Sequence, residues 1–157
     1  ACMTKQLPEL LHLHKSIDQP FSLVIMDIDH FKKVNDNYGH ISGDNCLKQI
    51  SSYIRQETRG DTDKIFRYGG EEILIFLNRT SSTDALRRVE TIRNGITRLP
   101  IKSDTGQIFT VTASFGISEY PTNGDDIDTL IKKADSALYT AKKSGRNRTI
   151  VYSDKNL

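Results

Sequence analysis

Residues 64–77 have the sequence KIFRYGGEEILIFL, in which two apolar runs flank a pair of glycines. Apolar runs on both sides of a two-glycine turn predict a β-hairpin. Since the two strands of a hairpin pair antiparallel, this segment excludes a purely parallel sheet. The fold class then depends on the elements that surround the hairpin.

Strand and helix patterns alternate on both sides of the hairpin. Residues 21–28 form a nearly continuous apolar run, which is typical of a strand buried on both faces. Residues 107–120 alternate apolar with polar side chains and predict a half-buried strand, and residues 149–152 predict a last short strand. Helical spacing of apolar residues occurs at 5–17, 29–36, from 42 onward, 83–99 and 126–144. We expect one α/β domain of the α+β type, with a central mixed, mainly antiparallel sheet surrounded by helices.

Length and composition are those of an ordinary globular chain. Its 157 residues suffice for one domain with a real core, and 27% of them are charged. Lys and Arg number 22 against 20 Asp and Glu, and the resulting net charge of +2 gives no general reason to expect nucleic acid as a partner. No apolar run approaches the roughly 18 residues of a membrane span, so no membrane contact is expected of this domain.

The cysteines and the N-terminus bear on location and on domain organisation. Cys2 and Cys46 form no disulfide framework or metal motif, which favours a reducing, cytoplasmic setting. The start Ala1-Cys2-Met3 is typical of an excised segment. We therefore expect residues 1–157 to form one domain, in which residues 1–20 are a helix and linker to a missing upstream region.

Two aspartates follow the buried strand 21–28. Ionised groups at the edge of a core need charged partners or a metal, so Asp27 is a candidate functional residue. Asp29 lies two residues further on, where a solvated helix cap is the simpler interpretation.

The tip of the hairpin carries Gly69, Gly70, Glu71 and Glu72. Such a tip is often only a solvated turn, but glycines also let a bulky ligand approach the backbone. If the hairpin lies beside strand 21–28, Glu71 would face Asp27. A pair of carboxylates there would suit Mg²⁺, which takes oxygen ligands and substrate phosphates.

A basic cluster closes the last predicted helix, formed by Lys142, Lys143, Arg146 and Arg148. Cations at a helix C-terminus complement the helix dipole, and beside a carboxylate site they could also bind a triphosphate. The P-loop pattern GxxxxGK[ST] is absent from the sequence. His12 and His14 match no metal motif and are expected at the surface.

The sequence also contains five blocks in a fixed order: DIDHFK (27–32), NDNYGHISGD (35–44), RYGGEEI (67–73), ADSALYTAK (134–142) and GRN (145–147). Together these blocks resemble the GGDEF domain of diguanylate cyclases, from about residue 21 to residue 152. The resemblance implies a fold related to the polymerase palm and to adenylyl cyclases. It also implies a reaction that joins two GTP molecules into cyclic di-GMP and releases two pyrophosphates.

The resemblance assigns metal-binding and catalytic roles residue by residue. Asp27, the backbone carbonyl of Ile28 and Glu71 would bind Mg²⁺, or Mn²⁺ in its place. Glu71 would also accept the proton of the attacking 3′-hydroxyl, and Glu72 would contribute to a second metal. Lys32 would stabilise the transition state.

The same resemblance assigns the substrate contacts. Asn35 and Asp44 would bind guanine, which offers N1–H and 2-amino donors that adenine lacks, so that the wrong base would leave a carboxylate unpaired. One site holds one GTP, so turnover would need a homodimer. Further substrate contacts fall on His40, Phe31, Gly69, Gly70, Lys142 and Arg146.

Three features depart from the family pattern. Ile73 stands where phenylalanine is usual, an apolar exchange that leaves activity expected. The family's product-inhibition motif is Arg-x-x-Asp; Asp63 fits it, but Gly60 replaces the arginine and Arg59 lies one residue off, so we expect weak or absent feedback. The usual N-terminal Asp-x-Leu-Thr segment is degenerate here.

Two other functions remain open from the sequence. One is a catalytically silent domain that binds GTP or serves as a cyclic di-GMP receptor, although Asp27, Glu71, Glu72, Asn35 and Asp44 are all present. The other is a related nucleotidyl cyclase with a different cyclic product.

Overall fold

A five-stranded sheet forms the centre of the protein, whose computed structural model describes residues 3–154. Neighbouring strands are antiparallel except for β6 and β7, which are parallel. The expected mixed, mainly antiparallel sheet is therefore confirmed, and so is the hairpin of residues 64–77. Across the sheet the strands are β2 (Lys64–Arg67), β3 (Glu72–Asn78), β1 (Phe21–Ile28), β6 (Ala113–Tyr120) and β7 (Thr149–Val151).

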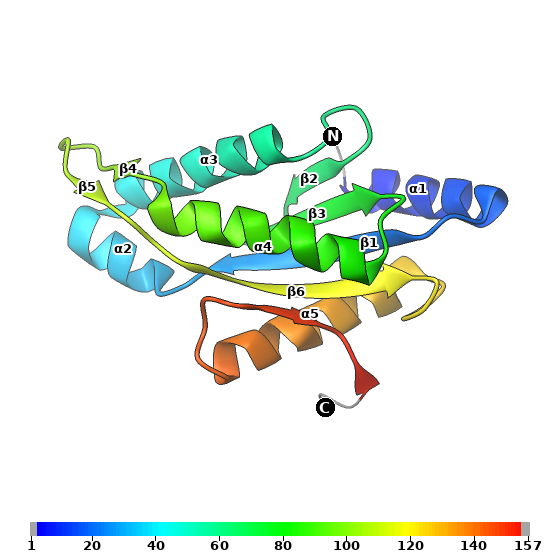
Figure 1. The fold of residues 1–157 in the computed structure, drawn as a ribbon. Coiled ribbons are helices and arrows are strands. Elements are labelled where there is room, and N and C mark those ends of the chain that lie inside the picture. Colours follow the sequence, from blue (N-terminus) through cyan, green and yellow to red (C-terminus); the bar gives the residue numbers. More distant parts are fainter. Residues whose placement is uncertain (1–2, 155–157) are drawn as a thin grey trace.

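Helices cover both faces of this sheet (Figure 1). They are α1 (Met3–Ile17), α2 (Phe31–Tyr38), α3 (His40–Glu57), α4 (Ser82–Arg98) and α5 (Ile127–Lys143). Helices α3 and α4 lie on one face and α1 and α5 on the other, while α2 stands at the end of β1. A small ribbon of β4 (Ile101–Lys102) and β5 (Ile108–Phe109) pairs separately. Within residues 3–154, no helix has the length and apolar character to cross a membrane.

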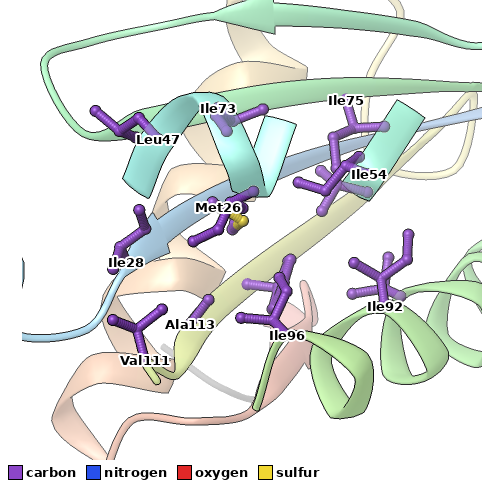
Figure 2. Packing of buried hydrophobic residues seen from close by; sticks show 14 of the residues in the cluster. Met26, Ile28, Leu47, Ile54, Ile73, Ile75, Ile92, Ile96, Val111 and Ala113 are labelled. Atoms are coloured by element: carbon purple, nitrogen blue, oxygen red, sulfur yellow. The ribbon is translucent and has the colours of Figure 1, made fainter. Parts of the chain in front are cut away.

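The period of two along β1 divides the core into two layers. Val24, Met26 and Ile28 pack on the α3 and α4 side, whereas Leu23 and Ile25 pack on the α1 and α5 side. Figure 2 shows the first layer, with side chains of α3 and α4 meeting those of the strands: Leu47, Ile54, Ile92 and Ile96 against Met26, Ile73 and Ile75. By the same period, Asp27 belongs to the face that α5 covers.

Strand β6 differs from the prediction in two ways. It begins at Ala113 rather than near residue 107, and it is buried on both faces instead of one. Its small residues Ser114, Gly116 and Ser118 are buried on the side that faces α5. Ser118 Oγ donates to Leu130 O of that helix at 2.7 Å. The small residues let the helix approach the strand closely, so the alternation in the sequence is one of side-chain size and not of exposure.

His14 and Cys46 are both buried in the structure. His14 was expected at the surface, but it is fully buried against Phe21 and Phe76, with Nε2 2.9 Å from Asn78 Oδ1. Cys46 is buried, and burial raises the pKa of its thiol to about 12. Cys2 and the ends of the expected 1–157 domain lie outside the described residues.

Candidate active site

The candidate site lies where β1 ends beside the hairpin of β2 and β3. Asp27 is paired with Glu72 in the antiparallel register of β1 and β3. Gly69, Gly70 and Glu71 lie in the turn that joins β2 to β3, directly before Glu72. The hairpin therefore lies beside strand 21–28, as predicted, and brings both glutamates to the end of β1.

Asp27 is an ionisable residue in the interior, with 4% of its surface exposed. Its Oδ2 forms an ion pair with Nζ of Lys142, which comes from the last turn of α5. Its Oδ1 is buried and has no hydrogen-bond partner within residues 3–154. An unpaired buried carboxylate oxygen costs about 1–3 kcal/mol, so this atom is suited to accept an additional cation.

The pKa values of both glutamates shift in the same direction. Burial raises the pKa of Glu71, the neighbouring Asp27 carboxylate raises it further, and Lys142 opposes the shift. Burial likewise raises the pKa of Glu72, with additional contributions from Asp135 and Asp27. Several negative charges thus gather near a single ammonium group, and a divalent cation would relieve their repulsion.

The donor set at this point is small and consists of oxygen atoms. No group of three His, Cys, Asp or Glu side chains converges to hold a metal anywhere in the described chain. Two carboxylates and a backbone carbonyl at the end of β1 nevertheless fit a hard cation such as Mg²⁺, which keeps waters or takes substrate phosphates for its other positions. The residues present are therefore compatible with a metal that is completed by its substrate.

A second group of expected site residues meets between α2 and α3. Gly43 lies in α3, and a β-carbon added there would come within 1.9 Å of Asn35 Oδ1 and 3.1 Å of Phe31 Cζ. Because Gly43 has no side chain, the Asn35 side chain can pack directly against the backbone of α3. His40 and Asp44 lie in the first turns of α3 with exposed side chains.

The remaining predicted residues lie on the hairpin turn, on α2 and after α5, and of these Gly69 contacts Glu72 through its backbone N–H, 3.4 Å from Glu72 O. Gly69 and Gly70 are exposed at the turn, and a β-carbon on Gly70 would meet nothing within 4 Å. Lys32 is exposed at the start of α2, and Arg146 is half-buried after α5. Sequence reasoning overlooked Arg67, whose Nη2 donates to Gly70 O at 2.9 Å and so braces the turn. Its position two residues before the first turn glycine was the available signal.

Asp29 corrects a prediction. It is not a solvated cap, because only 4% of its surface is exposed and its side chain makes no cap of α2. Its Oδ1 accepts from Ser114 Oγ at 2.7 Å, and its Oδ2 accepts from Thr112 Oγ1 at 2.6 Å and from Asn147 N at 2.9 Å. Asp29 is thus a buried acceptor that joins the end of β1 to two distant segments.

Fold and site together define an α+β domain that carries a carboxylate cluster at the end of its central strand. The profile of the family "Diguanylate cyclase, GGDEF domain" matches residues 1–148. The chain belongs to this family.

Relatives and solved structures agree with that assignment. Diguanylate cyclase A of Treponema denticola is 39% identical over 139 residues, which cover 88% of this chain and 37% of the relative. The GGDEF domain of TpbB (YfiN) from Pseudomonas aeruginosa superposes with a TM-score of 0.90 at 30% identity, covering 96% of this chain and 87% of that one. The active GGEEF domain of a Vibrio cholerae diguanylate cyclase gives 0.84 at 31%, covering 93% and 91%. The chain thus spans little more than a third of the curated relatives it matches first.

Proposed function

We propose that this domain is a diguanylate cyclase that condenses two GTP molecules into cyclic di-GMP and two pyrophosphates. The observation that carries the proposal is the buried Asp27, with one carboxylate oxygen unpaired, next to the glutamate-bearing turn of a GGDEF-family chain. In each half of the reaction, the 3′-hydroxyl oxygen of one GTP forms a bond to the α-phosphorus of the other. The bond from that phosphorus to the bridging oxygen breaks, and pyrophosphate leaves.

The carboxylates would hold the metal and move the proton. Asp27, the Ile28 carbonyl and Glu71 would bind Mg²⁺ or Mn²⁺, which when bound supplies positive charge to the α-phosphate and acidifies the hydroxyl. Glu71 would accept the hydroxyl proton, and Glu72 would serve a second cation. In the metal-free site burial and the neighbouring Asp27 carboxylate raise the pKa of Glu71, and a bound cation would oppose this shift.

Guanine would bind between α2 and α3. Asp44 would accept from the N1–H and 2-amino groups of guanine, and Asn35 would contact the base beside it. Phe31 would line the pocket, with His40 at its rim. Because adenine has no N1–H or 2-amino donor, a site built around Asp44 would reject ATP by leaving a carboxylate unsatisfied. The close packing of Asn35 over Gly43 supports this assignment, since it limits the directions in which the amide can point.

Basic side chains and the glycine turn of the hairpin would bind the phosphates. Lys142 lies against Asp27, so its ammonium is within reach of a metal-bound phosphate. Lys32 and Arg146 would place positive charge beside the phosphate oxygens, which carry the negative charge of the transition state. Gly69 and Gly70 would let the triphosphate approach the turn. Since each domain would hold one GTP, two domains must face each other for turnover.

Product analysis over a protein dilution series tests the proposal. Protein incubated with GTP and Mg²⁺ is expected to form cyclic di-GMP, with a specific rate that increases with protein concentration because the dimer is the active species. A fused dimeric coiled coil should remove that concentration dependence. GTP binding without product, even in the fused form, would contradict a cyclase and favour the receptor alternative.

Replacing Gly43 by alanine tests the guanine site. The new methyl would collide with Asn35 Oδ1 at 1.9 Å, so the amide must move, and we expect the KM for GTP to increase roughly tenfold. Alanine itself favours a helix, so the melting temperature should change little. Gly60→Ala is the matched control, because its methyl would meet nothing within 4 Å. An equal KM in the two variants would remove Asn35 from base recognition.

Feedback inhibition through Asp63 is expected to be absent. Asp63 is 5% exposed, and its carboxylate accepts from Asn78 N at 2.9 Å and Arg59 N at 2.8 Å while it pairs with Arg88. These contacts occupy the carboxylate within the fold. Initial rates should therefore not fall when cyclic di-GMP is added at the start, and Gly60→Arg should not create inhibition. Inhibition that does not weaken as GTP is raised would contradict this prediction.

A further inference from the structure

The loop between α5 and β7 has an unusual backbone next to the proposed phosphate site. Arg146 and Asn147 have φ values of 63° and 47°, so two consecutive residues other than glycine adopt the left-handed conformation. Side chains disfavour this region, and such a pair persists only where surrounding contacts hold it. One contact is local, from Arg146 N to Ala141 O at 2.9 Å.

Asn147 is held from one side by the end of β1 and by β6. Its backbone N–H donates to Asp29 Oδ2 at 2.9 Å and to Ser114 Oγ at 3.1 Å. Asp29 is itself fixed, because Thr112 and Ser114 donate their hydroxyls to it. A charged acceptor makes the stronger kind of hydrogen bond, and burial of Asp29 shields this one from water.

Arg93 of α4 holds Asn147 from the other side. Its Nη1 donates to Asn147 O at 3.1 Å and to Asn147 Oδ1 at 2.8 Å. The guanidinium is oriented by two bonds to Glu90, from Nε at 2.6 Å and from Nη2 at 3.1 Å. Thr149 of β7 also donates to Glu90 at 2.9 Å. These bonds raise the pKa of Arg93 and lower that of Glu90, in keeping with a well-formed pair.

We propose that Asp29 and Arg93 are positioning residues that clamp Asn147 and thereby aim Arg146 at the phosphates of the nucleotide. The peptide that joins Arg146 to Asn147 carries the N–H bound by Asp29. Fixing this peptide plane restricts the direction in which the Arg146 side chain leaves the loop. Neither positioning residue touches the nucleotide itself. This inference rests on the proposed function, from which it takes the role of Arg146.

A double-mutant cycle between Arg93 and Arg146 tests the clamp. We would measure the dissociation constant of GTP by calorimetry for the wild type, Arg93→Ala, Arg146→Ala and the double variant. Arg93→Ala is expected to weaken GTP binding roughly fivefold in the wild-type background and hardly at all when Arg146 is already alanine. Arg87→Ala is the matched control, because Arg87 lies on the same helix and pairs with Asp84 at the exposed surface. The control should bind GTP as the wild type does.

The outcomes separate this inference from the proposed function. The same weakening in both backgrounds, or none in either, would overturn the clamp while leaving GTP binding by the wild type intact. A wild type that fails to bind GTP at all would overturn the proposed function together with the clamp. Should Arg93→Ala fail to fold, Asn147→Gly serves in its place, because glycine adopts the left-handed backbone and deletes only the side-chain bond to Arg93.

Discussion

Glu71→Gln is expected to abolish cyclic di-GMP synthesis while the fold stays intact. Glutamine keeps the size and polarity of the side chain but cannot accept a proton or place a full negative charge beside a cation. The loss of a general base alone lowers rates by about 100-fold or more, and the loss of a metal ligand adds to it. Removing a carboxylate whose pKa is already raised by burial and by Asp27 should also relieve repulsion, so stability should not fall. Product formation and thermal melting measure the two effects separately.

Glu57→Gln is the matched control for this substitution. Glu57 ends α3 with an exposed side chain and lies outside the hairpin that carries Glu71. Its replacement makes the same chemical change and should leave turnover unchanged. If Glu71→Gln turned over GTP at the rate of Glu57→Gln, the proposed role of Glu71 as base and metal ligand would be wrong.

The position of Asp27 relative to the hairpin could be predicted from local sequence. The apolar run of residues 21–28 and the glycine turn at Gly69 and Gly70 define two segments that a compact sheet places side by side. The structure pairs Asp27 with Glu72, one residue from the expected partner Glu71. The apolar run and the glycine turn are therefore sufficient to predict that these carboxylates lie close together.

The anchoring role of Asp29 could not be predicted in this way. Its partners Thr112, Ser114 and Asn147 lie between 83 and 118 residues away along the chain. No periodicity in residues 27–32 indicates that hydroxyls from another strand will surround this carboxylate. A local pattern therefore favoured a solvated cap, whereas burial depended on tertiary contacts.

The ion pair of Lys142 with Asp27 has the same origin. The two residues are separated by 115 positions, and the helical pattern of residues 126–144 only placed Lys142 near a helix C-terminus. Sequence reasoning then left two interpretations open, a dipole interaction or a phosphate ligand. The packing of α5 across the sheet adds a third contact, because it brings the last turn of that helix over the end of β1.

Gly116→Ala is expected to cause the largest loss of stability among single-methyl additions in this domain. A β-carbon at Gly116 of β6 would lie 2.1 Å from Ala134 O and 2.3 Å from Leu138 N. Both atoms belong to the backbone of α5, so no side-chain rotation can relieve the collision and the helix must move off the sheet. Overpacking of this kind costs about 3 kcal/mol or more, which lowers the melting temperature by roughly 6–12 °C in a chain of this length.

Gly60→Ala again provides the comparison, since its methyl enters open space and should change stability by less than about 0.5 kcal/mol. Thermal and urea denaturation of the two variants measure the difference, and the soluble fraction after expression serves if Gly116→Ala does not fold. Because α5 carries Lys142 and leads into the Arg146 loop, any Gly116→Ala protein that folds should also bind GTP more weakly. A Gly116→Ala domain as stable as Gly60→Ala would show that α5 does not pack on β6 as closely as the structure places it. The small residues of β6 would then have no role in seating the helix, and the burial of both strand faces would need another cause.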